Sequence, residues 1–187
     1  MDRDALLIMD VQQGIVDQFS EASDYVARVG GAVSAARAYD IPVLFIRVAF
    51  RPKYPEVSDR NRSFRTLRER TDGGGPGLGD MHPDLHLAHD DIIVTKKRVS
   101  AFAGSDLDVI LRAQDIRHLV LAGIATSGVV LSTVREAADK DYILTVLEDG
   151  CLDRDPEVQR VLMEKVFVRQ ATVTSIASWI AGLVERE

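Results

Sequence analysis

Short runs of Leu, Ile and Val alternate along this chain with longer segments in which apolar residues recur at helical spacing. A strand covered on both faces is apolar throughout, so these runs indicate buried strands rather than half-exposed ones. We predict strands at residues 5–9, 42–48, 91–95, 118–122, 143–147 and 171–174. We predict helices at residues 22–39, 104–114, 128–140, 155–167 and 175–185. Strands that alternate with helices favour an α/β fold, a three-layer αβα sandwich around a Rossmann-like parallel sheet of about six strands.

Polar residues follow several of these strands, and one long interval separates the second strand from the third. Ligands of open parallel sheets bind outside the carboxyl ends of the strands, so the residues after Met9, Thr95 and Ala122 are the first candidates for a site. The interval, residues 49–90, shows little periodicity, and insertions of that length are often functional. Its segment 51–70 holds seven Arg or Lys residues against three acids. Those cations fit a solvated face, a carboxylate-binding surface or a subunit contact.

Composition and charge limit the class of protein. A length of 187 residues fits a single domain, which we expect to span 1–187. The net charge of -6 argues against a nucleic-acid partner, because phosphate binding needs clustered cations. No apolar run approaches the roughly 18 residues of a membrane span, and the N-terminus has no secretory pattern. The single cysteine, Cys151, is compatible with a reducing compartment. We therefore expect a cytoplasmic protein without nucleic-acid or membrane partners.

The most informative passage is the strand-turn-helix at 118–133, which contains Gly123-Ile124-Ala125-Thr126 and then Val129. A helix start presents unpaired backbone N–H groups, which suit an anion or a developing oxyanion. The passage resembles the Gly-Val/Ile-Ala-Thr-x-x-Cys turn of the isochorismatase-like (cysteine) hydrolases. In that family the cysteine is the nucleophile, and the matching position here is Val129.

Two further motifs occur in family order. Asp10 and Gln12 match the family's Asp-x-Gln signature, and Lys96, Ser100 and Phe102 match its Lys-x-x-x-Ser-x-Phe pattern. Taken alone, Asp10 is better explained as a cap or turn residue, and Lys96 could be a solvated strand end. The resemblance implies that Asp10 is the catalytic acid/base and that Lys96 accompanies it. Because parallel strand ends meet at one edge, we expect the two side chains to lie close together. Burial would raise the pKa of Asp10 and the lysine would lower it, so its resting state stays open.

The resemblance also implies the rest of the site. The Ile124–Ala125 peptide is expected to be cis, and backbone N–H groups of Ala125 and Val129 would form an oxyanion hole. Gln12, Thr126 and Phe102 are the remaining candidate substrate-binding residues. Val129 cannot act as a nucleophile, whereas its backbone N–H is retained. We expect Cys151 to serve packing rather than to replace the missing thiol.

A metal site and a cofactor are not expected. Asp80-Met81-His82 resembles the Asp-x-His metal motif of nicotinamidase-type relatives, but it precedes the third predicted strand rather than following the second. The glycine run at 73–79 lacks the Gly-Lys-Ser/Thr ending of a phosphate-binding loop. We interpret both as ordinary connections.

These patterns leave two functional hypotheses. The first is a hydrolase of a small anionic metabolite that uses Asp10 and Lys96 for acid–base chemistry without a covalent thioester intermediate. The second is a binding protein that keeps the pocket without turnover. A thiol-dependent amidase requires a residue that is absent. We expect the pocket to lie between Asp10, Lys96 and the 123–129 turn under part of the insertion, in a homo-oligomer, as is usual in the family.

Overall fold

The computed structural model describes residues 3–20, 22–70 and 78–185. Across these residues the strands are β1 (Arg3–Met9), β2 (Val43–Val48), β3 (Ile92–Lys96), β4 (Ile116–Ile124), β5 (Ile143–Leu152) and β6 (Thr172–Thr174). They pair in parallel in the order β3-β2-β1-β4-β5-β6. The predicted α/β sandwich is confirmed, and each predicted strand is found close to its expected place.

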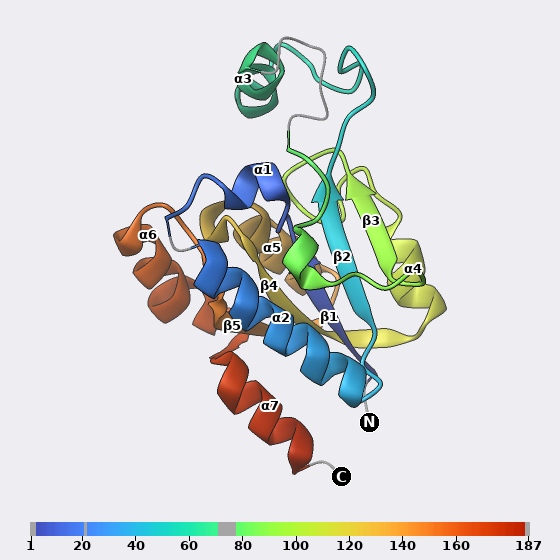
Figure 1. Cartoon of the computed structure of the whole chain (residues 1–187), viewed down its shortest axis with the longest axis vertical. Helices are drawn as coiled ribbons and strands as arrows, with labels where there is room; N and C mark the ends of the chain where they lie inside the picture. The colour runs from blue at the N-terminus through green and yellow to red at the C-terminus, as the bar shows by residue number, and fades with distance from the viewer. Residues whose placement is uncertain (1–2, 21, 71–77, 186–187) are drawn as a thin grey trace.

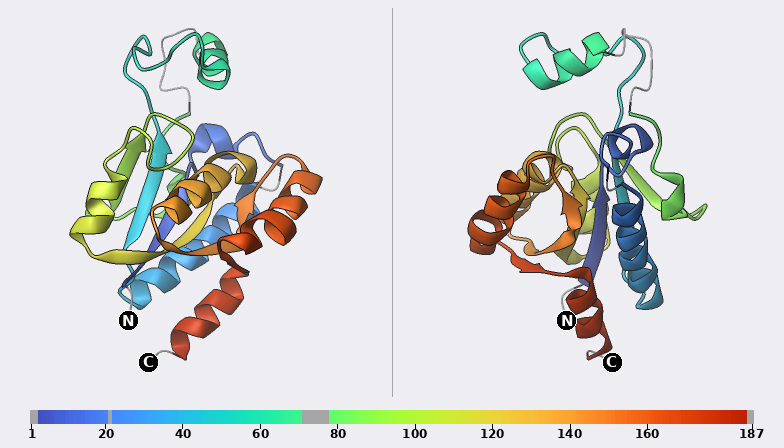
Figure 2. Two further views of the ribbon diagram at one scale, coloured as in Figure 1. Left: turned by 180° about the vertical axis from the view of Figure 1, so that it is seen from behind. Right: turned by 60° about the vertical axis from the view of Figure 1, so that its left-hand side comes forward.

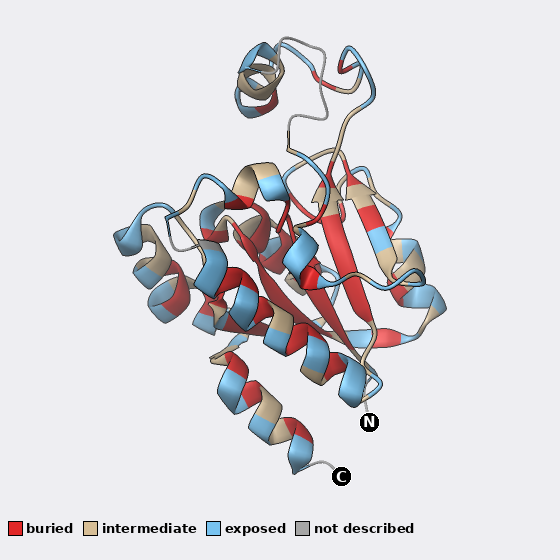
Figure 3. Ribbon diagram, in the orientation of Figure 1, coloured by how far each residue is buried: buried red, intermediate tan, exposed pale blue. Residues whose placement is uncertain are grey.

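Helices cover both faces of this sheet, as Figures 1 and 2 show. One face packs against α2 (Ala22–Ala38) and α7 (Ile176–Val184). The other packs against α4 (Leu107–Ala113), α5 (Leu131–Asp139) and the segment that follows α6 (Pro156–Val161). Along β1 the side chains alternate between these layers, Leu7 and Met9 facing one cluster and Leu6 and Ile8 the other. The strands are therefore buried along most of their length (Figure 3).

Several elements differ from the sequence prediction in extent, among them one helix and one strand. The helix predicted at 155–167 is divided into α6, a π-helical turn at Leu162–Val166 and a 3-10 turn at Phe167–Arg169. Strand β5 runs past the predicted end at residue 147 to Leu152. The register between the two strands shifts: β4 advances from Leu121 to Gly123 while β5 advances from Val146 to Cys151, so β5 continues beyond its apolar run.

The insertion contains a helix that the sequence pattern did not predict. Helix α3 (Arg62–Arg70) lies beyond the carboxyl edge of the sheet (Figure 1). Its apolar residues are Phe64 and Leu67, which join a small cluster with Tyr54 and Val57. Short helical turns also occur at α1 (Gln13–Val16) and at Pro83–Leu85. The glycines at 73–77 lie outside the described residues. Among the described helices, none combines the length and apolar character needed to cross a bilayer.

Candidate active site

Asp10 follows β1 directly and turns the chain away from the strand. Its φ angle is 57°, in the left-handed region that Asp tolerates better than most residues. Its N–H donates a hydrogen bond to the Ile46 carbonyl at 2.8 Å, which ties the turn to β2. The residue is 6% exposed. The local backbone thus buries a carboxylate at the carboxyl edge of the sheet.

Lys96, the last residue of β3, lies two strands away from Asp10, with β2 between them. Two strand spacings amount to roughly 10 Å, a gap that a lysine and an aspartate side chain together can bridge. The Lys96 Nζ lies 2.9 Å from Asp10 Oδ2. It also donates to the carbonyls of Arg98 at 3.0 Å and Val99 at 3.1 Å. All three ammonium protons are thereby used, and the expected pairing with Asp10 is observed.

The protonation equilibrium of Asp10, left open by the sequence, is dominated by burial. Burial raises the pKa of Asp10 to about 6, while the charge and hydrogen bond of Lys96 lower it by less. Asp10 Oδ1 is buried and has no hydrogen-bond partner among the described residues. Near neutral pH the carboxyl is mostly ionised, with one oxygen held by Lys96 and the other available as a proton acceptor.

The turn after β4 approaches β1 very closely at Gly123. A Cβ on Gly123 would lie 2.5 Å from the Met9 carbonyl oxygen, so this position excludes any side chain. The Ile124–Ala125 peptide is cis, as the resemblance predicted. A π-helical turn, Thr126–Val130, then leads into α5. The predicted oxyanion turn therefore follows β4, the strand that pairs with β1, and Asp10 follows β1.

Val129 is 2% exposed and joins the apolar cluster that contains Met9, Ala101 and Phe102. Phe102 is buried as well, with its ring centroid 6.0 Å from that of Tyr142 and 5.4 Å from the Lys140 Nζ. The side chains of Val129 and Phe102 are thus part of the apolar core on the α5 face of the sheet.

The carboxamide of Gln12 is fully occupied by the chain itself. Its Nε2 donates to the carbonyls of Gly79 at 2.7 Å and Val48 at 3.2 Å, and its Oε1 accepts the Val48 N–H at 2.9 Å. Val48 and Gly79 flank residues 49–78, which make up most of the insertion. Gln12, predicted to bind substrate, therefore holds Val48 and Gly79 together by hydrogen bonds, two residues from Asp10 in the sequence.

Two residues beside the turn were not found by sequence reasoning. The Asp153 Oδ2 accepts the Ser127 N–H at 2.7 Å, and the buried Thr126 hydroxyl donates to Gln159 Oε1 at 2.6 Å. Gln159 Nε2 in turn donates to the Cys151 carbonyl at 3.3 Å. In sequence these residues are indistinguishable from the capping and surface positions of a helix start, so only the fold brings them to the turn.

Cys151 and the histidines do not extend the site. The Cys151 thiol is buried in β5, and burial raises its pKa to about 12, so the reactive thiolate is disfavoured. Within residues 3–20, 22–70 and 78–185, no three His, Cys, Asp or Glu side chains are grouped closely enough to hold a metal ion.

Comparisons with known proteins relate this arrangement to one family. The family model described as an isochorismatase domain matches residues 4–178. Ureidoacrylate amidohydrolase RutB of Pseudomonas syringae pv. syringae is 30% identical over 205 aligned positions, which cover 96% of this chain and 80% of the relative. RutB of Pantoea ananatis is 31% identical, with 96% and 78% covered.

Solved structures agree with the sequence relatives. An isochorismatase family protein from Burkholderia thailandensis superposes with a TM-score of 0.86 at 30% identity, covering 97% of this chain and 95% of that chain. A cysteine hydrolase from Pseudomonas syringae pv. phaseolicola reaches 0.83 at 23% identity, covering 99% and 94%, and supports the fold alone. The chain therefore belongs to the isochorismatase family of hydrolases.

Proposed function

We propose that this protein hydrolyses a small anionic amide or ureido compound, with Asp10 as the group that moves the proton and without a covalent enzyme intermediate. The observation that carries this proposal is the buried Asp10–Lys96 pair, with Asp10 Oδ1 unpartnered among the described residues. A carboxyl group with a pKa of about 6 is suited to both taking and returning a proton near neutral pH.

The reaction begins when Asp10 Oδ1 takes a proton from a water molecule as the water oxygen attacks the substrate carbonyl carbon. Lys96 holds Oδ2 and keeps the carboxylate oriented. The carbonyl oxygen acquires negative charge, which the backbone N–H groups of Ala125 and Val129 stabilise. Collapse of the tetrahedral intermediate breaks the C–N bond, and Asp10 returns its proton to the leaving nitrogen.

The side chains support a route without a thiol. Val129, at the position of the family's nucleophile, is aliphatic, and Cys151 lies buried in β5 with a pKa raised to about 12. Neither residue supplies a nucleophile. Water is therefore the attacking group in the proposed reaction.

The substrate class is inferred from the relatives and from the charge of the insertion. The RutB relatives are named ureidoacrylate amidohydrolases, and ureidoacrylate carries both a carboxylate and a ureido group. Segment 51–70, with seven cations and three acids, lies beyond the carboxyl edge of the sheet. An anionic substrate matches that charge.

The test measures hydrolysis of ureidoacrylate and related amides by the wild type and by Asp10→Asn. The substitution keeps the shape of Asp10 but removes its proton acceptor, and general acid–base groups contribute about 10²–10⁴-fold to rate, so a loss of that size is expected. Asp17→Asn, at an exposed aspartate after α1, is the matched control and should retain full activity. Undiminished turnover by Asp10→Asn would refute the proposal.

The burial of Val129 in the core favours the second candidate, a binding protein without turnover. In that case a ligand would stabilise the native state and be recovered unchanged after long incubation with stoichiometric protein. Detectable product under those conditions excludes it. Val129→Cys tests the rest of the site. If this substitution creates amidase activity, the other catalytic groups are intact.

A further inference from the structure

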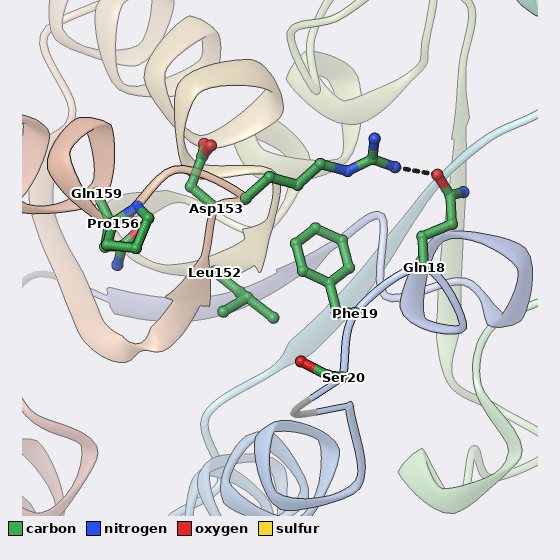
Figure 4. Close-up of a pocket in the computed structure, with 8 residues that line it drawn as sticks. Gln18, Phe19, Ser20, Leu152, Asp153, Pro156 and Gln159 are labelled. Carbon is green, nitrogen blue, oxygen red and sulfur yellow. Dashed lines mark hydrogen bonds between the residues drawn. The ribbon is translucent and has the colours of Figure 1, made fainter.

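A cavity lies between the segment that follows α1 and the region from the end of β5 into α6 (Figure 4). Its volume is about 430 Å³. The first segment contributes Gln18, Phe19 and Ser20, and the second contributes Leu152, Asp153, Arg154, Pro156 and Gln159. We call this cavity the Phe19–Arg154 pocket. It combines apolar walls with a few polar groups, as small-molecule sites do.

The residues that line the Phe19–Arg154 pocket do not include the proposed catalytic groups, Asp10, Lys96, Ala125 and Val129. Phe19 and Leu152 pack against the cluster on the α2 face of the sheet, as Ala125 does, whereas Val129 belongs to the cluster on the α5 face. Two lining residues nevertheless contact the turn itself, Asp153 through the Ser127 N–H and Gln159 through the Thr126 hydroxyl. The Phe19–Arg154 pocket therefore borders the proposed oxyanion turn and has its own set of lining residues.

Charge and shape in the pocket point to one class of ligand. The exposed Arg154 guanidinium lies 5.7 Å from the Phe19 ring centroid and donates to Gln18 Oε1, so its described partners are an aromatic ring and a neutral carboxamide. The acids beside it are held by backbone N–H groups, Asp153 by Ser127 and Asp155 by the first turn of α6. A guanidinium has five N–H donors, so most remain for a ligand.

We propose that the Phe19–Arg154 pocket binds a small organic carboxylate that carries a flat apolar group. The carboxylate accepts two hydrogen bonds from Arg154, a pairing that matches the guanidinium geometry. The flat group lies against Phe19 and Leu152, which supply the apolar walls. Nothing in the proposed hydrolysis requires this site, so the two proposals stand or fall separately.

Calorimetric titration with benzoate tests the proposal, with benzamide as the uncharged probe of the same shape. Benzoate should bind the wild type, and benzamide should bind roughly tenfold more weakly or worse, because it lacks the charge that strengthens the hydrogen bonds to Arg154. Arg154→Gln should weaken benzoate binding by a similar factor. Arg160→Gln, at an exposed α6 arginine paired with Glu164, is the matched control and should bind benzoate as the wild type does.

Asp10→Asn distinguishes this pocket from the catalytic site, since benzoate binding should survive that substitution unchanged. Unaltered melting temperatures will show that each variant is folded. The proposal is overturned if benzoate does not bind, if Arg154→Gln binds it as tightly as the wild type, or if Asp10→Asn abolishes binding.

Discussion

Replacement of Lys96 by Met removes the positive charge that compensates the buried Asp10 carboxylate and keeps an unbranched side chain of similar length. Lys96 is 2% exposed, and its Nζ contacts Asp10 Oδ2 at 2.9 Å and two backbone carbonyls. Loss of one partner of a buried ion pair costs about 3–5 kcal/mol, because the remaining charge stays without compensation. We expect a decrease of that size in the free energy of unfolding of Lys96→Met at pH 8.

The loss in free energy of unfolding caused by Lys96→Met should depend on pH, in a direction set by the pKa of Asp10. That pKa is raised to about 6 from 3.8, so between these values the folded state holds a proton that the unfolded state has lost. The contribution of Asp10 to the free energy of unfolding of the wild type therefore falls as the pH rises from about 4 to about 6, and it is constant above pH 6. Without Lys96 the pKa rises further and the fall continues to higher pH, by up to about 1.4 kcal/mol for each pKa unit.

Urea unfolding of the wild type and Lys96→Met at pH 5 and pH 8 measures both quantities. The two proteins should differ less in free energy of unfolding at pH 5 than at pH 8, by about 1 kcal/mol or more. At pH 5 Asp10 is mostly protonated even in the wild type. Lys97→Met, which removes the neighbouring lysine bonded to the Ala49 carbonyl, is the matched control and should show little pH dependence. Equal losses for Lys96→Met at both pH values would refute the reasoning.

Three further outcomes follow from the packing. Gly123→Ala should lower the free energy of unfolding by about 1–3 kcal/mol or more, because the new Cβ would overlap the β1 backbone. Gly31→Ala, in open space on α2, should raise it by up to about 1 kcal/mol. Urea unfolding measures both changes. Cys151 should resist iodoacetamide at pH 8 until the protein is unfolded, and fast native labelling would contradict its burial. Gln12→Leu should cost about 2 kcal/mol or more because it strands buried backbone groups, and exposed Gln13→Leu should cost little.

The strands were predictable because β1, β2 and β4 are covered on both faces and so each contains an apolar run, at residues 5–9, 43–46 and 119–122. Helix α3 was not, because five of its nine residues are charged and only two apolar residues mark its buried side. The extension of β5 depends on a register shift between β4 and β5 that no local pattern encodes. Strands buried on both faces could therefore be predicted from the local sequence. Elements whose position depends on distant contacts could not.

The site was predictable where it follows from topology. Asp10 and Lys96 end parallel strands, so their meeting required only the strand order. The use of Gln12 as a clamp on the insertion depends on where residues 48 and 79 meet, which the sequence does not state. The contacts of Asp153 and Gln159 with the turn are similarly long-range. Homo-oligomer formation stays a prediction.

The most direct test of the central claim, that Asp10 is the proton acceptor in hydrolysis, is the pH dependence of kcat/KM for ureidoacrylate or whichever related amide is turned over. Because kcat/KM reports the ionisation of the free enzyme, the account predicts a plateau from about pH 7 to 8 and a decline on the acid side with an apparent pKa near 6. A profile that is flat from pH 5 to 8, or that rises below pH 6, would contradict it.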